Sequence, residues 1–133
     1  MVVIKRVLVC AALIIGALSL SVAMVAAQGT VIGSGTFDGK SGHETSGGVD
    51  VVKGGDGRSV VLKEDFSLDS APDPKVGFGK DGEYDPASKL GHLQSKDGHQ
   101  TYAVPSALDL NKYNEVYIWC ERFNVPLGVA KFR

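Results

Sequence analysis

Hydrophobic and polar residues alternate with a period of two along most of the chain after Gly29, which predicts β-strands rather than helices. The apolar positions that share a face within each expected strand are Val31 and Phe37; Val49 and Val51; Val60, Leu62 and Phe66; Val76 and Phe78; and Tyr102 and Val104. Short runs of this kind, bounded by turn residues, are typical of an antiparallel meander or sandwich.

Four Asp-Gly pairs lie between these runs, at residues 38–39, 56–57, 81–82 and 97–98. Asp-Gly readily adopts the positive φ angles of tight turns. Each pair therefore predicts a reversal of the chain between two neighbouring strands.

One stretch, SALDLNKYN at residues 106–114, has helical rather than alternating spacing. Ser106 is placed to cap a single turn that carries Leu108 and Leu110, and the stretch is too short to be more than a connector. The whole pattern predicts an all-β fold: a single antiparallel β-sandwich, jelly-roll-like, with a short helical connector.

The run at residues 115–122 differs from the others because both of its faces are apolar. Val116, Ile118 and Cys120 share one face, and Tyr117 and Trp119 share the other. Such a run is typical of a central strand that is covered on both sides. Pro126 follows, and LGVAKFR supplies a short last strand.

Residues 1–27 have the three parts of a secretory signal: a basic start with Lys5 and Arg6, an apolar run, and small residues before Gln28. Cleavage after Ala27 is the preferred interpretation. The alternative is an uncleaved membrane anchor, because the apolar run has the length of a membrane span. In either case the domain at residues 28–133 is expected to be extracytoplasmic, whether secreted, periplasmic or held at the cell surface.

Composition excludes several classes of function. The chain has 133 residues and a formal net charge of −1, with no basic cluster, so we expect no nucleic-acid partner. The three histidines share no two-ligand zinc motif, so we predict no metal site. No nucleotide-binding or serine-hydrolase motif is complete.

The cysteines carry the remaining candidate chemistry. Cys10 lies in the apolar start, so removal of residues 1–27 leaves Cys120 as the only thiol and an intramolecular disulfide is impossible. C-x-x-C and C-x-x-C-H are both absent. Cys120 is then an inert buried residue, a bare redox thiol, the bridge of a disulfide-linked dimer, or the ligand of a prosthetic group such as haem. Alternation places Arg122 on the same side as Cys120, where a cation favours the thiolate.

The C-terminal half, LGHLQSKDGHQTYAVPSALDLNKYNEVYIWCERFNVPLGVA, resembles the DM-thirteen domain, an extracytoplasmic all-β module found alone in bacteria and, in animals, beside DOMON and b-type cytochrome domains. The matching pieces are Leu90-Gly91, Gly98 to Val104 with Pro105, Asp109-Leu110, Tyr113, and Val116 to Cys120 with Phe123 and Ala130. The N-terminal half fits more loosely, through His43 and Gly47. The segment SAPDPKVGF departs from the Gly-Pro-Asp of the family pattern.

The resemblance implies a role in electron transfer or in oxidative modification of surface proteins, rather than a stand-alone enzyme. The family's cysteine maps onto Cys120, acting as a bare thiol or holding a prosthetic group such as haem. His43 and His92 are then candidates for a second ligand. Because no cytochrome or DOMON segment accompanies the domain, the implied redox partner is a separate protein.

The alternative function belongs to a different class. A sandwich of this kind can serve as a non-catalytic binding module at the cell surface, recognising carbohydrate or protein, with a structurally buried cysteine. The residues that would supply stacking surface are Tyr84, Tyr102, Tyr113 and Tyr117.

Overall fold

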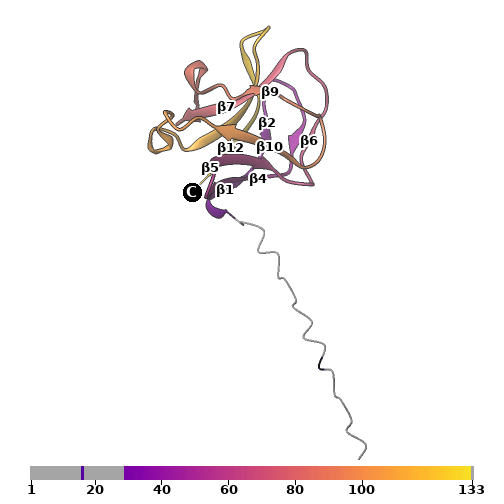
Figure 1. The fold of residues 1–133 in the computed structure, drawn as a ribbon. Helices are drawn as coiled ribbons and strands as arrows, with labels where there is room; N and C mark the ends of the chain where they lie inside the picture. Colours follow the sequence, from indigo (N-terminus) through magenta and orange to yellow (C-terminus); the bar gives the residue numbers. More distant parts are fainter. Residues whose placement is uncertain (1–15, 17–28, 133) are drawn as a thin grey trace, which may run out of the picture.

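The computed structural model describes residue 16 and residues 29–132, and these form an all-β sandwich of antiparallel strands (Figure 1). The predicted fold class is therefore confirmed. Apart from Gly16, the predicted signal or anchor at residues 1–27 lies outside the described residues.

Two main sheets make up the sandwich. The first has the strand order β1-β4-β5-β10. Its strands are β1 (Thr30–Thr36), β4 (Gly48–Gly54), β5 (Gly57–Leu62) and β10 (Gln100–Val104). The second has the order β2-β12-β11-β7-β8, with β9 also paired to β7. Its strands are β2 (Asp38–Gly39), β7 (Pro74–Lys80), β8 (Glu83–Asp85), β9 (Gly91–His92), β11 (Glu115–Cys120) and β12 (Val125–Lys131). A separate two-stranded ladder joins β3 (Thr45–Ser46) to β6 (Ser67–Leu68).

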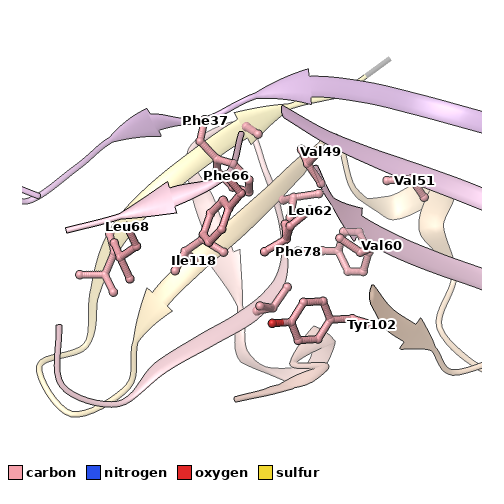
Figure 2. Packing of buried hydrophobic residues seen from close by; sticks show 14 of the residues in the cluster. Phe37, Val49, Val51, Val60, Leu62, Phe66, Leu68, Phe78, Tyr102 and Ile118 are labelled. Atoms are coloured by element: carbon pink, nitrogen blue, oxygen red, sulfur yellow. The ribbon is translucent and has the colours of Figure 1, made fainter. Parts of the chain in front are cut away.

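The core lies between the two main sheets, as the alternation predicts. Val49, Val51, Val60 and Leu62 of the first sheet and Val76, Phe78, Val116 and Ile118 of the second are all fully buried. Figure 2 shows such side chains converging between strands of both sheets. The expectation for Val31 is wrong: the pairing register of β1 shifts between Val31 and Gly33, and Val31 is exposed while Phe37 is buried. This bulge breaks the alternation that would have put both side chains on one face.

Two of the four Asp-Gly pairs form the predicted hairpin turns. Residues 55–56 form the turn from β4 to β5, which Gly57 opens, and residues 81–82 join β7 to β8 with φ angles of 51° and 90°. The prediction is wrong for residues 38–39, which form β2 itself, and residues 97–98 lie in a loop that precedes β10.

The described helices are two short 3-10 turns, η1 (Pro86–Ser88) and η2 (Leu110–Lys112). The predicted connector exists, but its cap is Asp109, whose Oδ1 accepts a hydrogen bond from the Asn111 amide at 3.0 Å, and not Ser106. Within residues 29–132, neither turn approaches the length of a membrane-spanning helix.

Strand β11 is central, as predicted, with β7 and β12 on its two sides. It ends at Cys120, and residues 121–124 form an exposed turn in which Asn124 has a φ of 53°. The sequence expectation for Arg122 is therefore corrected: Arg122 lies in the turn, so strand alternation does not direct it to the side of Cys120.

Candidate functional site

Cys120 lies on the inner face of β11, at the point where that strand ends. It pairs with Pro74 of β7 and Val125 of β12 and is 1% exposed. Its Sγ donates a hydrogen bond to the carbonyl oxygen of Pro72 at 3.0 Å. Cys120 is the only free cysteine in the part of the chain that the structure describes. The thiol is thus a core residue whose one polar contact comes from outside the sheet.

That contact belongs to a segment between β6 and β7, residues 69–73, which we call the cover loop. At its start, the Asp69 carboxylate accepts hydrogen bonds from the amides of Glu44 at 3.1 Å and Ser70 at 2.7 Å, and His43 Nδ1 lies 3.0 Å away. These bonds, led by that from the Glu44 amide, lower the pKa of Asp69 to about 2. The first end of the cover loop is therefore held by a carboxylate that is ionised at neutral pH.

The second end of the cover loop is held at Asp73. Its Oδ1 lies 2.8 Å from Nζ of Lys75, which is buried, and its carbonyl oxygen accepts the Glu121 amide at 3.2 Å. The hydrogen bond from Lys75 keeps the pKa of Asp73 below its usual value. Asp73 also has a φ of 56°, a left-handed conformation that costs energy for a residue with a Cβ atom. The interactions with Lys75 and Glu121 offset that cost.

The two candidate histidines lie at opposite ends of the cover loop. His43 contacts Asp69, and His92 Nδ1 lies 2.7 Å from Lys75 Nζ. Lys75 pairs with both His92 and Trp119 in the sheet, so His92 shares the face of Trp119. That face is opposite to the face of Cys120, because successive strand residues point to opposite sides. The structure thus links these residues through the cover loop and brings neither ring to the sulfur.

The four candidate tyrosines are mostly enclosed. Tyr102 and Tyr117 are buried, whereas Tyr84 and Tyr113 are partly exposed. Tyr84 stacks on Trp119 with ring centroids 4.4 Å apart, on the outer face of the second sheet. A shared open stacking surface of four tyrosines does not exist.

Comparison with protein families identifies the group to which this sandwich belongs. A family model described as electron transfer DM13 matches residues 36–132, which include the cover loop and Cys120. The chain belongs to the electron transfer DM13 family. The predicted resemblance is confirmed, and the membership indicates an electron-transfer-related role for this DM13 domain. Neither the curated proteins nor the solved structures include a match to the chain.

A haem on Cys120 of this DM13 domain would need open space beside the sulfur and a second ligand on the same side. Two grooves on the described residues have volumes of about 830 Å³ and 360 Å³, and Cys120 lines neither of them. The sulfur is covered by Pro72, and both histidine rings are engaged elsewhere. The residues around Cys120 in this conformation therefore do not fit a haem.

Sequence reasoning missed the cover loop. In the sequence, the segment SAPDPK stands out only by its departure from the family pattern, yet it contains Asp73 and the carbonyl oxygen of Pro72 that accepts the thiol's hydrogen bond. Its one usable signal is the pair of prolines at 72 and 74, which restrict the backbone on either side of Asp73. Lys75 gave no signal, since lysine is rarely a buried residue.

Proposed function

We propose that this DM13 domain is an extracytoplasmic electron-transfer module in which Cys120 acts as a bare redox thiol beneath the cover loop. The observation that carries the proposal is the single hydrogen bond from the Cys120 thiol to Pro72, in a loop with polar contacts of its own at both ends. Family membership supports the electron-transfer role. The signal-like pattern of residues 1–27 supports the location.

The closed conformation disfavours reaction in two ways. A thiol that donates a hydrogen bond keeps its proton, whereas the thiolate is the nucleophile. The Pro72 carbonyl also occupies the approach to the sulfur. Reaction therefore requires the cover loop to move away and the thiol to lose its proton.

The chemistry that follows is thiol–disulfide exchange with a separate protein. The Cys120 thiolate attacks one sulfur of a disulfide in that partner, a new S–S bond forms, and the partner's other sulfur leaves as a thiolate. Cys120 is oxidised to the disulfide level while the departing sulfur is reduced. A thiolate of a second, reduced protein then attacks the partner's sulfur in the mixed disulfide. The new S–S bond joins those two proteins, and Cys120 leaves as the thiolate and regains its proton, so the electrons that reduce the partner come from the second protein.

Oxidised glutathione is the probe for this proposal, with intact mass spectrometry as the measurement. In a Cys10→Ser background, the folded protein is expected to gain one glutathione, reversed by dithiothreitol, and the further change Cys120→Ser is expected to abolish that gain. A folded wild-type protein that gains none would contradict the bare-thiol role. A visible absorbance band that Cys120→Ser abolishes would show instead that Cys120 holds a prosthetic group.

A further inference from the structure

The larger of these two grooves lies on the outer face of the second sheet, along β12 and remote from the thiol. Its volume of about 830 Å³ falls within the range of small-molecule sites, roughly 300–1,000 Å³. The lining residues are Asp38, Lys40, Asp81, Gly82, Asn114, Glu115, Tyr117, Pro126, Val129, Lys131 and Phe132. They come from β2, β11, β12, the turn between β7 and β8, and three residues that flank these strands, Lys40, Asn114 and Phe132.

Glu115 supplies the buried polar group of this groove, because it is 2% exposed and lies at the start of β11. Its Oε1 accepts a hydrogen bond from the Gly82 amide at 2.7 Å and lies 3.4 Å from the Tyr117 hydroxyl. These contacts hold the β7–β8 turn in place and account for one carboxylate oxygen.

The second oxygen of Glu115, Oε2, makes no hydrogen bond and no ion pair with any residue that the structure describes. Every fully enclosed polar side-chain atom among those residues does have a partner. Glu115 lines the groove, and Oε2 is its carboxylate oxygen without a partner among the described residues, so Oε2 is the oxygen left for a ligand there. A carboxylate so deeply buried, with one oxygen open to a groove, is a built acceptor for a ligand donor.

The surrounding groups restrict the chemistry of that ligand. Lys131 pairs directly opposite Glu115, and Lys40 lies on the rim, so two ammonium donors accompany the carboxylate. Asp38 and Asp81 bring the charge of the lining to about −1, which disfavours anionic ligands such as nucleotides. The described residues contain no group of three ligands suited to a metal ion.

A neutral polyol can both donate hydrogen bonds to the carboxylate and accept them from the ammonium groups. Val129 and the partly exposed ring of Phe132 add an apolar wall of the kind on which the C–H face of a sugar packs. We propose that this groove is a binding site for neutral saccharides, with Glu115 as the buried acceptor and Lys131 as a donor at the rim. The site is independent of Cys120, which lies at the other end and on the other face of β11.

The test is an NMR titration of the ¹⁵N-labelled full chain, with cellobiose, maltose and diacetylchitobiose as probes. At least one disaccharide is expected to cause saturable shifts in the amides of Gly82, Glu115 and Val129, with a millimolar dissociation constant. Glucuronic acid is expected to bind more weakly. If none of the three disaccharides causes saturable shifts at these amides, the proposal is wrong.

Variants separate binding from folding. Glu115→Gln is expected to weaken saccharide binding about tenfold or more, because a hydrogen bond to a charged group is lost. Lys131→Met changes an exposed residue and is expected to weaken binding severalfold with an unchanged amide spectrum elsewhere. The matched controls are Glu83→Gln and Lys112→Met, which are exposed and outside the groove. Unchanged affinity in both groove variants would overturn the assignment, whatever the outcome of the thiol experiments.

Discussion

Strand β11 has a buried polar side chain at each end, and the two side chains face opposite sides of the sheet. At its last residue, Cys120 faces the core and is closed off by the Pro72 carbonyl. At its first residue, Glu115 faces outward, equally buried, yet one carboxylate oxygen opens to a groove. The solvent exposure of the two residues is 1% and 2%, so exposure alone does not distinguish them.

The difference lies in what covers each end. A neutral thiol tolerates an apolar core and needs only one acceptor, which a loop that is not part of the sheet supplies. A carboxylate needs several donors or water, so its environment must stay partly open. The same strand therefore carries a thiol that a loop covers and a carboxylate that lines a groove.

The largest expected effect on stability comes from placing a charge at the Cys120 end of β11, which the cover loop closes. Cys120→Asp should lower the free energy of unfolding by about 3–5 kcal/mol, since the carboxylate has no cation or donor there. Urea denaturation measures this loss, with Cys120→Ala as the control for lost packing and expected to cost about 1 kcal/mol. Equal stability of the two variants would show that water reaches the closed end.

Removing the carboxylate at the open end should cost less. Glu115→Ala deletes the acceptor of the Gly82 amide and should lower the free energy of unfolding by about 1–3 kcal/mol. Water in the groove can solvate the freed amide, which keeps the loss below that of Cys120→Asp. Glu83→Ala, at an exposed position in the same hairpin, should change stability by no more than about 0.5 kcal/mol. A larger loss for Glu115→Ala than for Cys120→Asp would reverse the comparison.

Acid should release the cover loop through Asp69. The pKa of Asp69 is lowered to about 2 in the folded protein, from about 3.9 in an unfolded chain. Its contribution to stability is therefore complete above pH of about 4 and is lost as the pH falls through about 2. The stability difference between wild type and Asp69→Asn, measured by urea denaturation, should shrink over that interval. A difference that stays constant down to pH of about 2 would remove Asp69 from the support of the loop.

High pH should have the smallest effect on stability, through the ionisation of partly or fully buried tyrosines. Burial raises the pKa values of Tyr84 and Tyr117 to about 12, and the hydrogen bond to Asp85 does so for Tyr113. Raised values favour the neutral phenols, so their contribution to stability holds below pH of about 10 and is lost as the pH rises toward 12. Phenolate absorbance should show Tyr84, Tyr113 and Tyr117 titrating well above pH of about 10 while the fold persists. Titration of any of the three near pH of about 10 would show that its ring is more open to solvent than the structure has it.

The sequence predicts the sandwich and its central strand because period-two alternation reflects burial directly, as at Val116 and Ile118. It also predicts the family and singles out Cys120. It fails where geometry depends on distant segments: the bulge near Val31 and the role of residues 69–73 depend on partners elsewhere in the chain. Glu115 gave no signal either, because a glutamate at a strand start is usually exposed.

The kinetics of the reaction between Cys120 and Ellman's reagent test the central claim most directly. The rate is compared with the rate of global unfolding, measured on the same protein in the same buffer. We expect the thiol to react faster than the molecule unfolds, and Asp69→Ala to accelerate the reaction while leaving the folded spectrum intact. A thiol that reacts only as fast as the whole domain unfolds, in both proteins, would show that Cys120 is an inert core residue.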